Sequence, residues 1–148
     1  MNKNEIIDYL IDHTQKEIEL LRQSEKEDIK SVSEEQNDEN RFENTIEEEV
    51  QLISKQNVVL EDLTERLKGL SSIRRDVVHT NVGKGALVQL NTGLLLVMSA
   101  FPTVKIGDLE VTGISTQSLI YQKMEGFKKG AEFHLTGHPT EHVLLDIA

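Results

Sequence analysis

The residues best suited to chemistry are carboxylates gathered in one acidic stretch. Residues 34–49 contain eight Asp and Glu side chains and a single base, Arg41. Asp38, Glu39 and Glu43 lie at or beside a predicted turn, and carboxylate oxygens are the ligands that Mg²⁺ prefers. Because Mg²⁺ often takes only one or two protein ligands, these three residues are the candidate metal ligands. The alternative is a solvated helix end whose acids serve solubility and the helix dipole.

Three histidines, His134, His138 and His142, recur at four-residue spacing. On a helix they would share one face, but Gly137 and Pro139 interrupt any helix here. On a hairpin, His134 and His142 could meet across the strands, as a zinc site would require. Imidazoles at a surface turn, without a metal, are the more common reading of such a pattern.

Other chemistries lack the residues that they need. The chain has no cysteine, which excludes disulfides, thiolate zinc sites and cysteine nucleophiles. Residues 82–85, VGKG, lack the spacing of a phosphate-binding loop and precede a predicted strand rather than a helix. Asp, His and Ser residues are too scattered for a nucleophilic triad. We therefore expect no catalytic residue and no tightly bound cofactor.

The acidic stretch lies inside a long helical region. No glycine or proline occurs before Gly69, and the absence of these helix breakers predicts helix. Apolar residues recur there at alternating steps of four and three, the a/d pattern of a coiled coil. The first stripe comprises Ile7, Ile11, Thr14, Ile18 and Leu21, and the second comprises Ile46, Val50, Ile53, Asn57, Leu60, Thr64 and Leu67.

A polar link, residues 31–41, separates the two stripes. Asn40 followed by Glu43 fits a capping box that opens the second helix. Two helices of about thirty residues joined by a short link should fold back antiparallel, giving a rod of roughly 45 Å at about 1.5 Å per residue. In that register Ile18 packs near Asn57. One continuous helix that forms a dimer is the competing interpretation.

The chain from Gly69 onward is predicted to be rich in strands, because it holds all nine glycines and both prolines. The turn Asn91-Thr92-Gly93 predicts a hairpin. A short helix over residues 116–125 is closed by Gly126, and a final hairpin surrounds residues 137–139. The predicted strands are residues 86–90, 94–100, 110–115, 131–136 and 142–147. Strands with one short helix predict a small α+β domain.

The negative charge is concentrated in the helical region. Residues 1–70 hold nine Lys and Arg against nineteen Asp and Glu, whereas residues 71–148 hold seven of each. Duplex DNA would be repelled by the helical region, and a basic protein surface or metal ions would be attracted. The longest apolar run is too short to cross a bilayer, and the N-terminus does not have the pattern of a secretory signal. We expect a cytoplasmic protein with no membrane contact.

This arrangement, a long helical hairpin with an acidic tip before a small β-rich domain, resembles the Gre-type transcript cleavage factors of bacteria. Two stretches carry the resemblance. Residues 38–44, DENRFEN, are similar to the acid-rich tip where the family's second helix begins. Residues 114–133, ISTQSLIYQKMEGFKKGAEF, resemble the family's strand, serine-led turn, short helix and glycine-bounded basic turn before the last hairpin.

The resemblance implies a fold, a partner and a metal. The β-rich domain would be FKBP-like and dock on RNA polymerase beside its secondary channel, which the hairpin would enter. It implies partner-binding roles for Asp38, Glu39, Glu43, Ser118 and Tyr121. The three tip acids would also help to hold Mg²⁺ shared with the polymerase. The chain would not be an enzyme, and would at most stimulate RNA cleavage by the polymerase.

Two departures from the family pattern shape the expected function. Arg41 stands three residues after Asp38, where the family has a glutamate. Leu119 and Tyr121 replace a proline and a glycine of the serine-led turn. Many relatives bind the same channel without cleavage, so a polymerase-binding regulator of elongation is the expected function. A coiled-coil adaptor unrelated to polymerase is the alternative, and a prolyl isomerase would rest on the fold alone.

We therefore predict an α+β chain of two parts. Residues 1–70 form an antiparallel coiled-coil hairpin with an acidic tip. Residues 71–80 form a linker, and residues 81–148 form the FKBP-like domain.

Overall fold

The computed structural model describes residues 2–34, 39–135, 137 and 139–148, and only the backbone of residues 25–34, 39–54 and 56. The chain has the predicted mixed α+β composition, with long helices followed by a six-stranded sheet. It divides into two compact units. The helical unit is Ile11–Lys68, and the sheet unit combines Met1–Leu10 with Gly69–Ala148. The first turns of the first helix therefore belong to the sheet unit.

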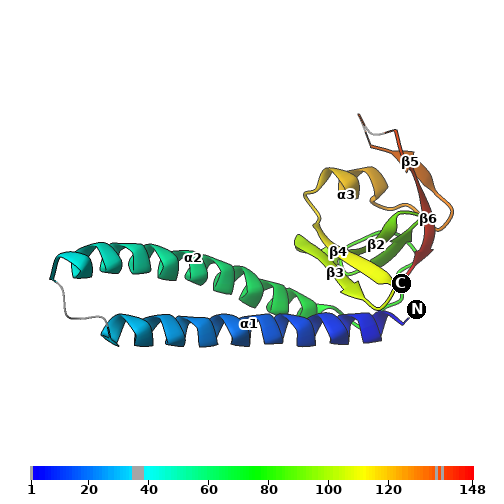
Figure 1. Ribbon diagram of the computed structural model, residues 1–148. Coiled ribbons are helices and arrows are strands. Elements are labelled where there is room, and N and C mark those ends of the chain that lie inside the picture. The colour runs from blue at the N-terminus through cyan, green and yellow to red at the C-terminus, as the bar shows by residue number, and fades with distance from the viewer. Residues whose placement is uncertain (1, 35–38, 136, 138) are drawn as a thin grey trace. The chain divides into compact units, whose positions relative to one another are not determined.

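The helical unit is built from two long helices that run in opposite directions (Figure 1). Helix α1 spans Lys3–Glu34 and helix α2 spans Glu39–Ser72. Helix α2 begins one residue before Asn40, so the predicted capping box, which placed Asn40 outside the helix, is wrong. On α1 the predicted apolar stripe is confirmed, because Ile7, Thr14 and Ile18 are buried and the other two members are half-buried.

The predicted stripe on α2 is wrong in part. Asn57 and Thr64 are exposed, whereas Leu63 and Leu70, which the stripe omitted, are buried. The Thr64 hydroxyl donates to the Leu60 carbonyl of its own helix at 2.7 Å. Leucines three and four residues apart then supply the buried side of the helix. The side chains of Ile46, Val50 and Ile53 lie outside the described residues.

The register between the helices also differs from the prediction. Glu17 of α1 forms an ion pair with Arg66 of α2, with 3.7 Å between Oε2 and Nη1. Ile18 shares a groove with Thr64 and Leu67, and not with Asn57. Residues 64–67 of α2 therefore lie beside Glu17 and Ile18 of α1.

The sheet contains six strands in the order β3-β4-β2-β1-β6-β5. Five of them match predicted strands. The strands are β1 Leu87–Leu90, β2 Gly93–Met98, β3 Phe101–Ile106, β4 Leu109–Ser115, β5 Glu132–His134 and β6 Glu141–Ile147. Strand β3 was missed because Pro102 resembles a breaker, yet β3 lies at the edge of the sheet, where a missing N–H is tolerated.

The predicted hairpin at Asn91 and Thr92 is confirmed, with β1 and β2 antiparallel and Leu90 opposite Gly93. Strand β4 then pairs with β2 in parallel and with β3 antiparallel. At this junction a Cβ on Gly113 would lie 2.0 Å from the ring of Phe101, so only glycine fits.

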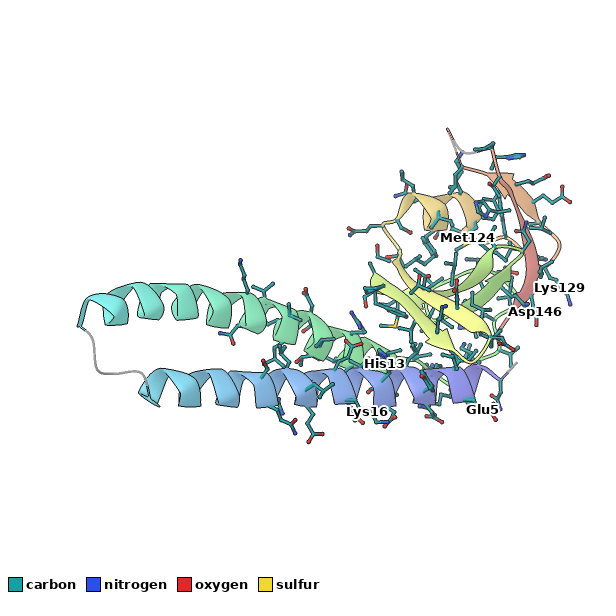
Figure 2. All side chains as sticks on the ribbon, viewed as in Figure 1. Glu5, His13, Lys16, Met124, Lys129 and Asp146 are labelled. Atoms are coloured by element: carbon teal, nitrogen blue, oxygen red, sulfur yellow. The ribbon has the colours of Figure 1, made fainter. Side chains whose placement is uncertain are left out.

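The predicted short helix is confirmed with narrower bounds as α3, Leu119–Met124, and Gly126 ends it with a φ of 77°. Met124 lies on α3 above the sheet (Figure 2) and is fully buried. The core of the sheet unit joins α3 to five strands and to the segment that precedes β1. Its buried members are Val82, Ala86, Val88, Leu90, Val97, Ile114, Tyr121, Met124, Phe133 and Leu144.

Candidate partner-binding site

The three predicted tip ligands fall at the edge of what the structure describes. Asp38 lies outside the described residues. Glu39 and Glu43 belong to the first two turns of α2, where only the backbone is described. Among the side chains that are described, no three or more His, Cys, Asp or Glu residues are grouped as metal ligands would be. The metal site at the tip therefore stays a prediction.

Ser118 has a defined structural role at the start of α3. It is the N-cap residue, and its Oγ accepts a hydrogen bond from the Tyr121 N–H at 3.3 Å. The same hydroxyl donates to the Ser115 carbonyl at 2.8 Å. A side-chain cap satisfies one of the free N–H groups of a helix start. Ser118 thus fixes the turn that connects β4 to α3.

Tyr121 contributes to the core. Its side chain is only 6% exposed and belongs to the cluster under α3. Burial raises the pKa of the Tyr121 phenol, and the charge and hydrogen bond of Glu125 raise it further. Tyr121 therefore stays neutral at physiological pH and anchors α3 on the sheet.

Leu119 is an exposed apolar side chain of α3. It is 78% exposed, although it is a large apolar residue beside the Ser118 cap. The sequence carried a usable signal for this exposure. Tyr121 and Met124 lie three residues apart and define the buried side of the helix, so Leu119 falls on the other side.

A shallow hollow lies on the sheet unit beside α3. Its volume is about 190 Å³, smaller than the 300–1,000 Å³ that is typical of small-molecule sites. The lining contains three threonines and one carboxylate among aliphatic residues, and no aromatic side chain. The lining residues are Leu90, Thr92, Gly93, Leu94, Leu95, Thr103, Glu110, Thr112 and Ile120.

The two described histidines of the last hairpin, which the sequence allowed to meet across the strands, do not meet. In the register of β5 and β6, His134 pairs with Glu141 and His142 pairs with Phe133, so the two imidazoles lie on opposite faces. The His134 Nε2 is 4.0 Å from the Glu141 carboxylate. The His142 ring stacks on Phe133 at 5.2 Å between centroids. His138 lies outside the described residues.

A second surface feature, a groove of about 510 Å³, lies on the helical unit. Polar residues surround an apolar floor made by Ile18 and Leu67. Elsewhere on the same unit the apolar side chains of Leu20, Val58 and Val59 are exposed by 66%, 59% and 48%. The helical unit therefore has apolar surface that a partner could cover. Within the described part of the chain, no helix has the length and apolar character needed to span a membrane.

In comparisons with known proteins, no family model, no curated protein and no solved structure matches the chain.

Proposed function

We propose that this chain is a Gre-like factor that binds RNA polymerase at its secondary channel and modulates transcription elongation. The observation that carries the proposal is the local structure of residues 114–133. That stretch forms the end of β4, a serine-capped turn, helix α3, a glycine-bounded turn and β5. This is the order of elements expected from the resemblance in sequence, and it supports an FKBP-like domain.

The two long helices support the second half of the proposal. Helices of 32 and 34 residues that run in opposite directions are consistent with a coiled-coil hairpin. At about 1.5 Å per residue, thirty residues reach about 45 Å. A rod of that length is suited to entering a channel. The acidic composition of residues 34–49 gives the tip a charge that a cation would favour.

The docking contact on the sheet unit is centred on Leu119. Ser118 and Tyr121 act as positioning residues, because one caps α3 and the other is buried beneath it. A few residues near the centre of an interface commonly supply most of its binding energy. The predicted partner-binding pair thus orients Leu119 toward the polymerase.

The tip acids fit Mg²⁺ by their donor chemistry, since carboxylate oxygens are hard ligands. Asp38, Glu39 and Glu43 would hold the ion together with the polymerase, and the ion would supply charge stabilisation for RNA cleavage. Arg41 lies among these acids, and its positive charge opposes a cation. We therefore propose docking and regulation as the main activity, with no catalysis by the isolated protein.

A coiled-coil adaptor is the second candidate function. It is favoured by one observation, the exposure of Leu20, Val58 and Val59 on the helical unit. A dimer would bury such side chains, whereas a channel-entering monomer has no need of them. Sedimentation of the full chain separates the two, because the polymerase-binding proposal expects a monomer at micromolar concentration.

The binding test uses purified bacterial RNA polymerase core enzyme and the full chain. We expect Leu119→Asp to weaken binding by about tenfold or more, the effect of losing an interface anchor. Val78→Asp is the matched control, since Val78 is 82% exposed in the same unit and outside α3. Equal binding by both variants would reject the Leu119 contact. No binding by the wild type would reject the polymerase proposal itself.

The cleavage test uses backtracked elongation complexes and the triple variant Asp38→Asn/Glu39→Gln/Glu43→Gln. We expect the wild type to bind without stimulating RNA cleavage, and the variant to behave in the same way. Stimulation by the wild type and its loss in the variant would instead assign the tip acids to the metal. The isolated protein is expected to cleave no RNA in either case.

A further inference from the structure

The hollow beside α3 combines an aliphatic surface with polar side chains from neighbouring strands. Leu95 of β2 is in register with Thr112 of β4, and the Thr112 Oγ1 lies 2.7 Å from the Thr103 Oγ1 of β3. Glu110 precedes Thr112 by two residues on β4, so both side chains lie on the same face of the sheet. Gly93 also lines the hollow and has no side chain to fill it. The hollow therefore places a carboxylate and hydroxyl oxygens beside apolar side chains.

The hydroxyls of the hollow have more acceptor than donor capacity to offer a ligand. The hydroxyls of Thr103 and Thr112 together have two donors and four lone pairs, and the bond between them uses one of each. The Thr92 Oγ1 lies 3.3 Å from the His142 Nδ1. When that nitrogen carries no proton, the hydroxyl donates to it and keeps its own lone pairs. The Glu110 carboxylate only accepts when it is ionised, so the hollow suits a group rich in N–H donors.

The aliphatic part of the lining suits the stem of a lysine side chain. Leu95 and Ile120 are half-buried, so part of each side chain is accessible in the hollow. A lysine has an ammonium group with three donors on a flexible four-carbon stem. Such stems lie along apolar surface while the charged group stays among polar groups or water. A volume of about 190 Å³ is small for an organic ligand, and it matches a site for a single side chain.

A lysine of the same chain already lies near Glu110. Lys105 stands opposite Glu110 in the register of β3 and β4, and its Nζ lies 3.8 Å from the Glu110 Oε1. This separation exceeds the length of an ordinary hydrogen bond, and the Lys105 side chain is 78% exposed. Exposed pairs of this kind are weak. The Glu110 carboxylate can therefore accept a shorter, charge-assisted hydrogen bond from a second ammonium group.

We propose that this hollow binds a lysine side chain of a protein partner, with its ammonium group on Glu110 and its methylene groups on Leu95 and Ile120. Lysine is favoured over arginine because an ammonium group turns its donors toward acceptors on several strands, whereas a guanidinium holds its donors in one plane. A partner's lysine is favoured over a free polyamine because the carboxylate of Glu110 matches one ammonium group. The identity of the partner as RNA polymerase rests on the proposed function, whereas the selectivity for lysine does not.

The selectivity is tested by NMR titration of the full chain. The probe is lysine capped by N-acetyl and N-methylamide groups, and the amide and methyl signals of Thr92, Thr103 and Thr112 are followed. Norleucine with the same caps is the control, because it has the same four-carbon stem without the ammonium group. We expect saturable shifts with the lysine probe and severalfold weaker binding of the norleucine probe. Equal binding of the two probes, or no binding of the lysine probe, would overturn the proposal.

Variants of the full chain assign the ammonium group to its carboxylate. Glu110→Gln should weaken binding of the lysine probe severalfold, to the level of the norleucine probe. Asp108→Asn is the matched control, because Asp108 is an exposed carboxylate two residues away that does not line the hollow. Lys105→Gln should strengthen binding, since it removes a competing positive charge. Equal losses in Glu110→Gln and Asp108→Asn, or weaker binding in Lys105→Gln, would overturn the assignment.

Two further measurements identify the source of the ammonium group. Putrescine is the polyamine probe, and tighter binding of putrescine than of capped lysine would overturn the choice of a protein partner. With RNA polymerase core enzyme, Glu110→Gln should bind severalfold more weakly than Asp108→Asn. Equal binding of both variants, with the wild type bound, would overturn the inference and leave the proposed function intact. A wild type that does not bind polymerase would reject the proposed function, and the titration with capped lysine would then decide the inference.

Discussion

The sheet unit and the helical unit are stabilised in different ways. The sheet unit has a continuous core that joins α3 to strands far apart in sequence, such as β1 and β6. Among the described side chains of the helical unit, only Thr14, Ile18 and Leu63 are buried. The described part of the helical unit therefore has a narrow buried seam and an ion pair between its helices, whereas the sheet unit is held by packing. Core substitutions should test the sheet unit, and seam or charge substitutions should test the helical unit.

The same contrast appears in the distribution of charge. The excess of acidic residues lies within residues 1–70, whereas residues 71–148 are balanced. Mutual repulsion opposes the close packing of two acidic helices. A unit with few buried apolar side chains is also expected to open locally at lower free energy than one with a continuous core. The helical unit should therefore be the more sensitive to salt and to seam substitutions.

The largest expected effect is on the core of the sheet unit. Leu144 is 1% exposed and lies in the core cluster, so Leu144→Ala should leave a cavity and lower the free energy of unfolding by about 3–5 kcal/mol. Leu145→Ala is the neighbouring control, because Leu145 is 44% exposed. Chemical denaturation followed by NMR signals from the strands measures both. Equal losses in the two variants would contradict the packing account.

A smaller effect is expected on the helical seam. Ile18→Asp places a charge on a buried position and should destabilise the helical unit by about 2–3 kcal/mol. The loss is moderated because Ile18 borders a groove and Arg22 lies one turn away. Leu20→Asp, at a position 66% exposed, is the matched control. Helical circular dichroism should melt earlier in Ile18→Asp while the NMR signals of the sheet persist. Simultaneous loss of the helical circular dichroism and of the NMR signals of the sheet would show that the two units do not unfold independently.

The outcome at these positions shows what the sequence could predict. Long helices, five strands, the hairpin at Asn91 and the short helix after Ser118 all follow from local patterns of breakers and apolar residues. Strand β3 was not predicted, because it contains Pro102. Proline is tolerated in an edge strand, but the sequence does not show which strand lies at the edge of the assembled sheet. The buried side of α2 was not predicted fully either, because Leu63, which lies outside the predicted stripe, is buried while Thr64 is exposed.

The candidate site likewise has parts that the sequence could predict and parts that it could not. The sequence singled out the segment around Ser118 but not the exposed side chain within it, Leu119, because exposure follows from how α3 lies on the sheet. The contact of Lys3 with Ala148 joins the two ends of the chain. No local pattern predicts such a contact, since it requires α1 and β6 to be placed first.

Alkaline pH tests the core through Tyr121. Its folded-state pKa is raised above the ordinary 10.0 by burial and by Glu125. The stabilisation is therefore complete below pH 10.0 and is lost as the pH rises toward the folded-state pKa. Tyr121→Phe should remove this alkaline loss from the sheet unit. Measuring the denaturation midpoint across this range checks it, and a variant that kept the wild-type pH dependence would contradict it.

The smallest expected effect concerns the ion pair of the helical unit. Glu17 and Arg66 join α1 to α2 at 3.7 Å, with the Arg66 side chain 15% exposed and the Glu17 side chain 40% exposed. A double-mutant cycle with Glu17→Gln and Arg66→Gln should give a coupling of about 0.5 kcal/mol that decreases with added salt. The pair Asp12–Lys16 is the control, since it lies within α1 and is 61% and 73% exposed. Its coupling should be smaller, because solvent screens both partners and no second helix is held by it. A Glu17–Arg66 coupling no larger than that of the control would mean that charge contributes nothing specific to the seam. Packing at Ile18 and Leu63 would then have to account for the helical unit by itself.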